Sequence, residues 1–213
     1  MTRPIDHTYD YIKNRILDGT YKPSQRLTEA DLSEAIGVSR NTVKKALLQL
    51  ERENLVYIEK NRGAFIKSFT LDEILNFLEI REVLEGLVTR NAVASITNEQ
   101  LENLESILTR MKSSLDLYQF DDYSALNKEF HSVIYQAARN PQAVEIINMI
   151  KTQLSRYHFR TILIPGRNEK SYQEHSQIVQ AFKSRDANLA EKAITNHIAN
   201  VRKTIQDNFN LLL

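Results

Sequence analysis

The pattern of apolar and polar positions predicts two helices separated by a tight turn within residues 28–53. Val43, Ala46 and Leu47 recur with helical spacing in the second of these helices. Gly37 lies where the first helix must end, because glycine takes the left-handed conformation that closes a helix without steric cost. The stretch therefore has the outline of a helix–turn–helix.

Two short stretches that alternate between apolar and polar residues follow, at residues 55–59 and 64–67, and the basic turn KNRG joins them. An amphipathic helix is predicted ahead of all this, over residues 5–18. Together these elements predict a winged helix-turn-helix with a small β-hairpin wing over residues 1–68.

From residue 69 to residue 213 the apolar positions keep a helical period almost throughout. Six helices are predicted, over about residues 70–95, 97–117, 121–138, 141–159, 171–184 and 187–211. The buried face of the first is assigned to Ile74, Phe77, Leu78, Val83, Leu84, Leu87 and Val88. The expected fold class is therefore mainly α, with an all-α antiparallel helical bundle after the winged helix.

Composition restricts the class of protein. Hydrophobic content of 42% and charged content of 26% fit a soluble globular chain, and no apolar run approaches a membrane span. The N-terminus lacks the apolar core of a signal peptide. The absence of cysteine excludes disulfides and thiolate chemistry, so a cytoplasmic location is expected.

The distribution of charge favours a nucleic-acid partner for the N-terminal part. The whole chain has a net charge of only +1, but residues 1–68 carry +3 and residues 69–213 carry −2. Residues 38–67 hold seven basic against three acidic side chains. Positive charge therefore gathers where the helix–turn–helix and wing are predicted, as contact with phosphate requires.

The side chains that would face DNA follow from the same pattern. Arg40, Asn41, Lys44 and Lys45 lie off the apolar stripe of the second helix, where they suit entry into a major groove. In the turn of the wing, Arg62 can meet phosphate or a minor groove, and Gly63 allows close approach of the backbone. The alternative is an ordinary helical hairpin with solvated charges.

A polar constellation is predicted inside the bundle. Asn127 and His131 are four residues apart on one helix, and His175 and His197 lie among apolar residues on the last two helices. Because polar groups on buried faces need partners, a shared metal ion would satisfy all four. The alternative is that each imidazole is hydrogen-bonded and structural.

Arginines form a second candidate set, for an acidic effector. Arg81 stands among apolar residues on the first bundle helix, and Arg156 and Arg160 lie at the end of the fourth. A guanidinium facing a cavity would pair with a carboxylate through two hydrogen bonds. Solvation at the surface or an internal salt bridge is the alternative.

The order of these motifs resembles one family. YKPSQRLTEADLSEAIGVSRNTVKKALLQLERENLV followed by NRGAF resembles the winged helix of GntR-family transcriptional regulators. ILNFLEIREVLEGLVTRNAV, LNKEFHSVIY and SYQEHSQIVQAF resemble the FCD ligand-binding domain of the FadR-like subfamily, in its VanR-type, six-helix form. The resemblance covers essentially the whole chain. It implies a homodimeric regulator that binds a two-fold symmetric DNA operator, more often as a repressor, and responds to a small organic acid.

On the DNA side, the resemblance implies roles for Arg40, Asn41, Thr42, Lys44, Arg62 and Gly63. Family members often carry Thr-Pro where this chain has Asn41-Thr42, and Arg-Glu where it has Lys44-Lys45. Lysine cannot make the planar two-pronged contact with guanine that arginine makes. The operator is therefore expected to differ from the common family site, with more affinity carried by phosphate contacts.

On the ligand side, the resemblance implies a metal site at Asn127, His131, His175 and His197, the positions that match the family pattern. Asn127 stands where relatives often carry aspartate, which removes a negative charge from the site. Zn²⁺, Ni²⁺ and Mn²⁺ all tolerate ligation rich in nitrogen. Open positions on the ion would take an effector carboxylate, with Arg81 as its counter-charge.

Two rival functions follow from the same residues. Three histidines with an open coordination position can activate water, as in a metal-dependent hydrolase. No HExxH motif is present, and Glu174 adjoins His175 in sequence, where neighbouring helical side chains do not face the same way. The other rival is a regulator that senses the metal itself.

Overall fold

The computed structural model describes residues 3–155, 161 and 164–212. The chain divides into two compact units, one built on residues 1–70 with 152–156 and the other on residues 71–151 with 157–213. Each unit has its own buried apolar core.

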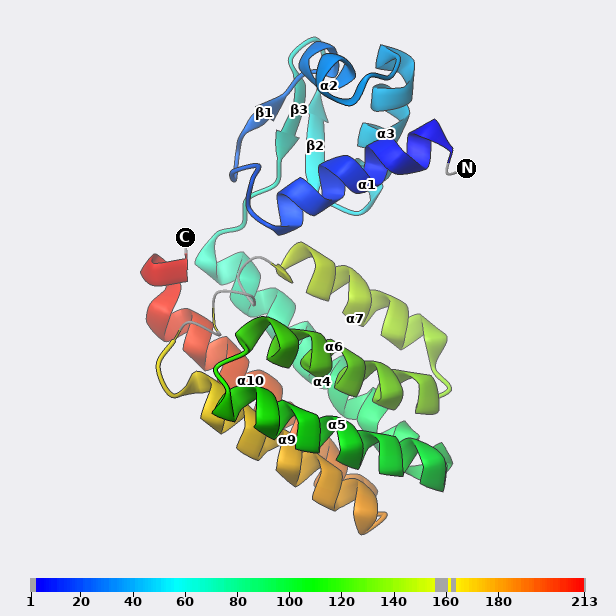
Figure 1. Ribbon diagram of the computed structural model, residues 1–213, viewed down its shortest axis with the longest axis vertical. Helices are drawn as coiled ribbons and strands as arrows, with labels where there is room; N and C mark the ends of the chain where they lie inside the picture. The colour runs from blue at the N-terminus through cyan, green and yellow to red at the C-terminus, as the bar shows by residue number, and fades with distance from the viewer. Residues whose placement is uncertain (1–2, 156–160, 162–163, 213) are drawn as a thin grey trace. The chain divides into compact units, whose positions relative to one another are not determined.

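The N-terminal unit is a winged helix-turn-helix (Figure 1). Its elements are α1 (Pro4–Leu17), β1 (Arg26–Leu27), α2 (Glu29–Ile36), α3 (Arg40–Arg52), β2 (Val56–Glu59) and β3 (Gly63–Ile66). The apolar stripe predicted for α3 is buried, with Val43, Ala46, Leu47 and Leu50 all at most 2% exposed. It packs with α1 and the strands into one core.

Local chemistry sets the tight turn between α2 and α3, as predicted. The hydroxyl of Thr28 accepts the N–H of Asp31 at the start of α2. Gly37 ends α2 with φ 75°, and the hydroxyl of Ser39 accepts the N–H of Thr42 at the start of α3. These contacts fix where α3 begins, and therefore which side chains its first turn presents.

The sheet has one strand more than the sequence predicted. The order is β1-β3-β2, with antiparallel pairing throughout, and Arg26 and Leu27 of β1 lie opposite Phe65 and Ala64 of β3. β1 is only two residues long, too short to show an alternating pattern. The prediction of a two-stranded hairpin was therefore incomplete.

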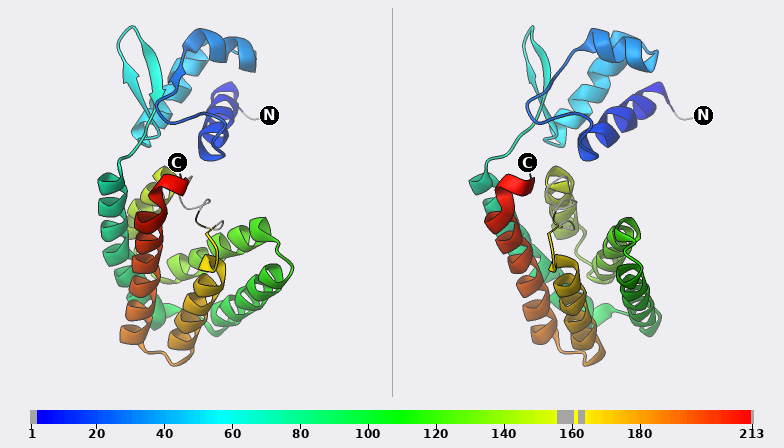
Figure 2. Two further views of the ribbon diagram at one scale, coloured as in Figure 1. Left: turned by 90° about the vertical axis from the view of Figure 1, so that its left-hand side faces the viewer. Right: turned by 60° about the vertical axis from the view of Figure 1, so that its left-hand side comes forward.

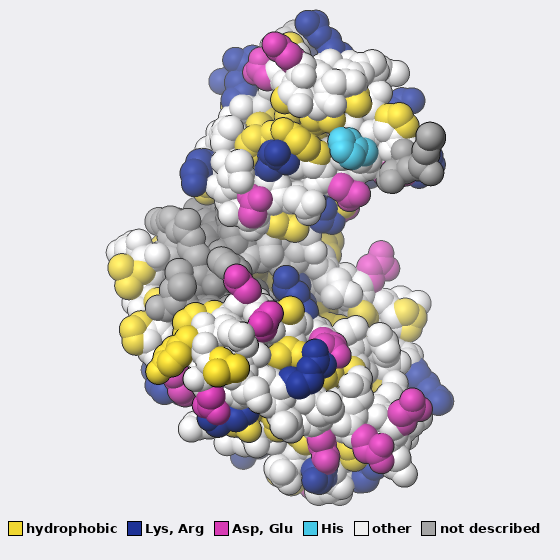
Figure 3. Space-filling view, viewed as in Figure 1, with side chains coloured by type: hydrophobic (Ala, Val, Ile, Leu, Met, Phe, Trp, Pro, Cys, Tyr) yellow, Lys and Arg dark blue, Asp and Glu magenta, His cyan; other side chains and the backbone are white. Residues whose placement is uncertain are grey.

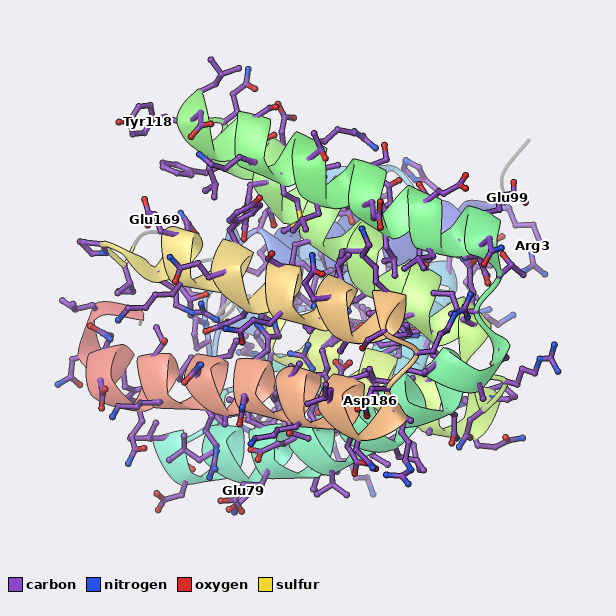
Figure 4. All side chains as sticks on the ribbon, turned by 90° about the horizontal axis from the view of Figure 1, so that it is seen from below. Arg3, Glu79, Glu99, Tyr118, Glu169 and Asp186 are labelled. Carbon is purple, nitrogen blue, oxygen red and sulfur yellow. The ribbon has the colours of Figure 1, made fainter. Side chains whose placement is uncertain are left out.

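The C-terminal unit is an all-α bundle. Its described helices are α4 (Leu71–Ser95), α5 (Asn98–Asp116), α6 (Phe120–Ala137), α7 (Pro141–Gln153), α9 (Arg167–Lys183) and α10 (Ala187–Leu212). α4 and α10 run side by side, and α9 packs between α10 and α5 (Figures 2 and 4). α6 packs on both α4 and α5. The core is apolar, and Phe130 and Phe182 are among its largest fully buried side chains.

Helix caps in the bundle follow the sequence motifs. Thr97 and Gln100 form a capping box at the start of α5. The carboxylate of Asp186 accepts two backbone N–H groups at the start of α10. The fourth bundle helix was predicted to continue to about Phe159, but α7 ends at Gln153 and Leu154 lies in a turn, so this boundary was wrong. Phe159 itself lies outside the described residues.

Two other parts of the bundle prediction were wrong. Val83 and Leu87 were assigned to the buried face of α4, but they are 71% and 42% exposed. α9 begins at Arg167, four residues before the predicted start, directly after Gly166 in the left-handed conformation. Within residues 3–155, 161 and 164–212, no helix is long and apolar enough to cross a membrane.

Candidate functional site

The first turns of α3 present a polar and basic face. Arg40, Asn41, Lys44 and Lys45 are all exposed, while the opposite face of the helix is buried. Thr42 is half-buried, and its hydroxyl lies 2.9 Å from that of Ser39, so it also helps to fix the start of the helix. This face carries two lysines, one arginine and one carboxamide, which suits phosphate and base-edge contacts.

The wing holds its arginine in place through its neighbours. Arg62 is exposed, forms an ion pair with Glu59, and places its guanidinium 5.5 Å from the centre of the Phe65 ring. Arg26, which sequence reasoning did not single out, donates a hydrogen bond to the carbonyl of Arg62. The pairing of β1 with β3 brings it there.

Glycine is required at position 63 by the sheet itself, in addition to the predicted close approach of the backbone to DNA. Its φ of 97° favours glycine, and a Cβ atom at this position would lie 2.7 Å from the carbonyl oxygen of Leu27 in β1. The close approach that requires glycine is therefore already present within the sheet.

The second candidate site lies inside the bundle, where two helices carry polar ladders with a spacing of four residues. On α6 the ladder is Asn127, His131 and Tyr135, and on α4 it is Arg81, Glu85 and Thr89. Apart from the half-buried Asn127, every member is less than 9% exposed. On the face shown in Figure 3 no histidine colour is visible over the bundle, in keeping with this burial. Buried polar ladders of this kind need partners.

Three of the predicted ligands meet in space. The ring centres of His131, His175 and His197 lie 4.6–5.5 Å apart, and one nitrogen of each lies within 4.8 Å of the others. The rings come from α6, α9 and α10 and are at most 4% exposed. Phe130 packs edge-on against His175, with ring centres 4.8 Å apart. The arrangement satisfies the first requirement of a metal site, convergence of the donor atoms.

Hydrogen bonds leave the facing nitrogens of two imidazoles available. Nδ1 of His175 lies 2.6 Å from the carbonyl oxygen of Ser171, and Nδ1 of His197 lies 2.6 Å from Oε2 of Glu174. Each contact assigns the proton to Nδ1, so Nε2 of each ring carries a lone pair. Nε2 of His175, both ring nitrogens of His131 and Oδ1 of Asn127 are buried without a hydrogen-bond partner. These unsatisfied atoms fit a bound cation.

The imidazoles are neutral, as metal ligands must be. Burial lowers the pKa of His131 and His175 well below the ordinary value, and at His131 the charge of Lys151 adds to the shift. Burial also lowers the pKa of His197, outweighing its hydrogen bond to Glu174. Lone pairs are therefore available at neutral pH without a competing proton.

Glu174 is a site residue that sequence reasoning set aside. It does not face His175, its neighbour in sequence, but its carboxylate accepts hydrogen bonds from His197 and, at 2.9 Å, from Asn200. It also pairs with Arg167 at 3.0 Å. Burial acts to raise the pKa of Glu174, but His197 and Arg167 together hold it below its ordinary value. The anion sits behind the ring of His197, as in carboxylate–histidine–metal arrangements.

Beside the histidines lies a buried network that the sequence did not reveal. Nε of Arg81 and the hydroxyl of Tyr135 donate to Oε1 of Glu85, at 2.8 and 2.6 Å. Oε2 of Glu85 has no hydrogen-bond partner and lies 3.8 Å from Nδ1 of His131. Lys151 donates to the hydroxyl of Tyr135 at 3.3 Å. Arg81 was a candidate for binding an acidic effector, with an internal salt bridge as the alternative, and the structure shows the salt bridge to Glu85. The other two candidates, Arg156 and Arg160, lie outside the described residues.

Comparisons with known proteins agree with this architecture. The model of the FCD domain matches residues 76–200, and the model of the gntR family of bacterial regulatory proteins matches residues 4–66. A solved structure of a transcriptional regulator described as GntR, from a Rhodococcus species, has a TM-score of 0.76 at 20% identity. It covers 97% of this chain and 99% of its own, and shows the same fold.

Curated relatives extend over nearly the whole chain. The HTH-type transcriptional repressor RspR of Escherichia coli is 26% identical over 206 residues, which cover 96% of this chain and 90% of RspR. The Uxu operon regulator of Haemophilus influenzae is 30% identical over an alignment 227 residues long, gaps included, that covers 95% of this chain and 83% of that protein. The chain therefore belongs to the GntR family of bacterial regulatory proteins, in its FCD-domain subfamily, and is a DNA-binding transcriptional regulator rather than an enzyme.

Proposed function

We propose that this regulator is a cytoplasmic homodimer whose operator affinity is controlled by a small carboxylate bound at a metal ion inside the bundle. Residues 1–68 would bind DNA, and residues 69–213 would bind the effector and dimerise. The observation that carries the proposal is the convergence of three neutral, buried imidazoles, two of which, His131 and His175, have unsatisfied nitrogens. Repression is the expected mode, as in RspR.

Asn127, His131, His175 and His197 would hold the ion. The unpartnered Oδ1 of Asn127 lies one helical turn from His131 and supports its role as the fourth ligand. A divalent ion in this site would supply a Lewis-acid centre with open positions for an anionic ligand. Since all four protein ligands are neutral, its two positive charges favour a carboxylate there. Zn²⁺, Ni²⁺ and Mn²⁺ all suit this donor set.

Control of DNA binding requires a difference in effector affinity between two states of the regulator. An effector that binds the DNA-competent and the DNA-incompetent state equally changes nothing, however tightly it binds. We therefore expect operator affinity to change by roughly 5–150-fold between free and liganded protein, the usual range of such coupling.

The proposal is tested by measuring DNA binding in three conditions. A duplex selected by the protein from a random pool would be titrated with chelated protein, metal-loaded protein, and metal-loaded protein with a panel of carboxylates. A change that needs both metal and carboxylate supports the proposal. A change that follows free metal alone would indicate a metal sensor. Unchanged affinity in all three conditions would refute effector control.

Lys44 provides a test of the DNA face. We expect Lys44→Ala to weaken binding to the selected duplex, to reduce the slope of log affinity against log salt by about 1, and to change discrimination against a scrambled duplex. The physical reason is the loss of an exposed cation from the first turns of α3. Lys112→Ala, an exposed lysine of α5, is the matched control. Equal affinity and discrimination in Lys44→Ala and the control would contradict this assignment.

Glu174 provides a test of the metal site that spares its ligands. Glu174→Gln keeps the shape of the side chain but removes the anion behind His197, and we expect metal affinity to fall by about 10–100-fold. Glu169→Gln, an exposed glutamate near the start of the same helix, is the control (Figure 4). Competition with a chelating dye measures both. A metal affinity that is unchanged in Glu174→Gln would exclude a role for Glu174 in orienting the ring of His197.

An exposed apolar stripe on α4 supports the homodimer. Ile80, Val83 and Leu87 are 50%, 71% and 42% exposed and recur at i, i+3 and i+7 on one face of the helix. Ion pairs that join α4 to α10 flank the stripe, namely Arg202 with Glu79 and Glu82, and Arg90 with Glu191. An apolar centre within a polar rim is the usual anatomy of an interface. Glu79 points outward from α4, at the edge of the bundle (Figure 4).

Val83→Asp is expected to weaken the dimer by about 100-fold or more, because an unpaired carboxylate would lie at the centre of the interface. Ile146→Asp, at an exposed apolar residue of α7, is the control and should leave the dimer intact. Sedimentation equilibrium measures the association constant. A Val83→Asp protein that remains as dimeric as the control would exclude this stripe as the interface.

A further inference from the structure

The network beside the histidines contains more positive than negative charge. Its two cations, Arg81 and Lys151, stand against a single carboxylate, that of Glu85. The hydrogen bonds that Glu85 accepts from Arg81 and from the neutral hydroxyl of Tyr135 both go to the same oxygen, Oε1, and only the contact with Arg81 neutralises its charge. Among the described residues, one positive charge of this network therefore has no carboxylate partner.

That charge is on Lys151. The hydroxyl of Tyr135, at 3.3 Å, accepts its hydrogen bond, and the ammonium lies 4.9 Å from the centre of the same ring. Among the ion pairs formed by the described residues, none includes Lys151. An ammonium has three donors, so at least two remain for a ligand or water. Burial, followed by the charge of Arg81, lowers the pKa of Lys151 to about 8.

Lys151 is connected to the imidazole cluster by short contacts. Tyr135 lies one helical turn after His131, with ring centres 6.0 Å apart. Glu85 accepts a hydrogen bond from Tyr135 through Oε1, and its Oε2 lies 3.8 Å from Nδ1 of His131. A ligand anchored at the imidazoles therefore has the unpaired ammonium close by, at the other end of the same ladder of α6.

We propose that Lys151, positioned by its hydrogen bond to Tyr135, forms a second anion subsite, so that the effector carries two acidic groups, one at the imidazole cluster and one at Lys151. The effector class is then a short dicarboxylate or a phosphorylated carboxylic acid. The inference rests on the proposed function, since it takes the imidazole cluster as the first subsite. With a divalent ion bound, the site would hold three positive charges in excess, which two anionic groups neutralise better than one.

The test compares matched acids that differ by one terminal anionic group. Binding to full-length, metal-loaded protein would be measured by calorimetry for butyrate against succinate, and for glycerate against 3-phosphoglycerate. We expect the second member of at least one pair to bind about 10–100-fold more tightly, as a charge-assisted hydrogen bond to a half-buried lysine provides. A preference for succinate identifies a carboxylate in the second subsite, and a preference for 3-phosphoglycerate identifies a phosphate.

Variants of Lys151 assign the preference to this residue. Lys151→Met keeps the length of the side chain without its charge, and should bring the two members of the preferred pair to within about threefold of each other, because the charge-assisted hydrogen bond is lost. Lys151→Arg should retain most of the preference, and Lys112→Met is the control for an exposed lysine. Thermal unfolding would establish that each variant folds.

The outcomes separate this inference from the proposed function. Equal binding within each pair, no binding by any of the four acids, or a preference that survives in Lys151→Met would overturn the second subsite. Metal content, measured on the same samples, reports on the proposed function by itself. Protein that holds one ion per chain and binds butyrate as tightly as succinate would leave the metal site standing and refute only the role of Lys151.

Discussion

Replacing Glu85 with glutamine is expected to lower the free energy of unfolding of the bundle by about 3–5 kcal/mol. Glu85 is fully buried, and its carboxylate is the ion-pair partner of Arg81, which is itself 4% exposed. The amide has no charge, so the buried guanidinium would lose the ion pair that Glu85 provides. Chemical denaturation of chelated protein measures the effect, because a bound metal would add its own stabilisation.

The chain contains a matched control for burial. Lys112 and Asp116 form an ion pair with the same spacing of four residues on α5, but their side chains are 50% and 59% exposed. Asp116→Asn should therefore change stability by less than about 1 kcal/mol. A second variant, Arg81→Met with Glu85→Gln, should be less destabilised than Glu85→Gln alone, because it removes the orphaned cation. Equal losses in Glu85→Gln and Asp116→Asn would show that Arg81 is solvated after all.

Replacing His175 with alanine is expected to abolish stable metal binding, with a loss in affinity of more than about 100-fold. The ring is fully buried, and its unsatisfied Nε2 faces the other two imidazoles. The loss of metal affinity on removing a ligand should exceed the 10–100-fold loss expected when only the hydrogen-bond partner of a ligand, such as Glu174, is changed. Chelated protein would be exposed to a mixed pool of Zn²⁺, Ni²⁺ and Mn²⁺, and its metal content determined after desalting.

His7 supplies the control, since it is exposed and belongs to the N-terminal unit. His7→Ala should retain about one ion per chain, as wild type does, while His175→Ala and His197→Ala retain none. Because His175 and His197 lie on different helices, a folding defect in one variant would not explain the loss of metal in both. Wild-type protein without any retained ion would refute the metal site, and the imidazoles would then be treated as direct contacts for the effector.

The sequence predicted those features whose chemistry is local. Gly37 was predicted to end α2 in the left-handed conformation, and it does so, because this effect depends only on the residue itself and its neighbours within one helical turn. The pattern of apolar residues located the helices for the same reason. It failed for Val83 and Leu87, because apolar residues lie on nearly every side of α4 and the pattern cannot choose among them.

Features that depend on how helices cross were only partly predictable. The pairing of Asn127 with His131 follows from their spacing on one helix, and the three histidines stood out because imidazoles are rare among apolar neighbours. Glu85 gave a weaker signal, because it is one of several carboxylates on α4 and only its position four residues after Arg81 sets it apart. Lys151 gave none, since a lysine in the last turn of a helix is ordinary. Its proximity to Tyr135 exists only in the folded bundle.

The groups of the bundle site come from five different helices, with Glu85 on α4, His131 on α6, Lys151 on α7, His175 on α9 and His197 on α10. Because no single helix carries more than a part of these groups, a ligand binds them together only when the bundle is folded. A ligand present at 100 times its dissociation constant would therefore add about 2.7 kcal/mol to the stability of the bundle.

The melting temperature of the chain thus becomes a direct readout of occupancy. A library of small acids can be ranked by the melting shift that each produces, with and without added metal, before any operator sequence has been found. The search for the physiological signal and the search for the regulated promoter can then proceed independently.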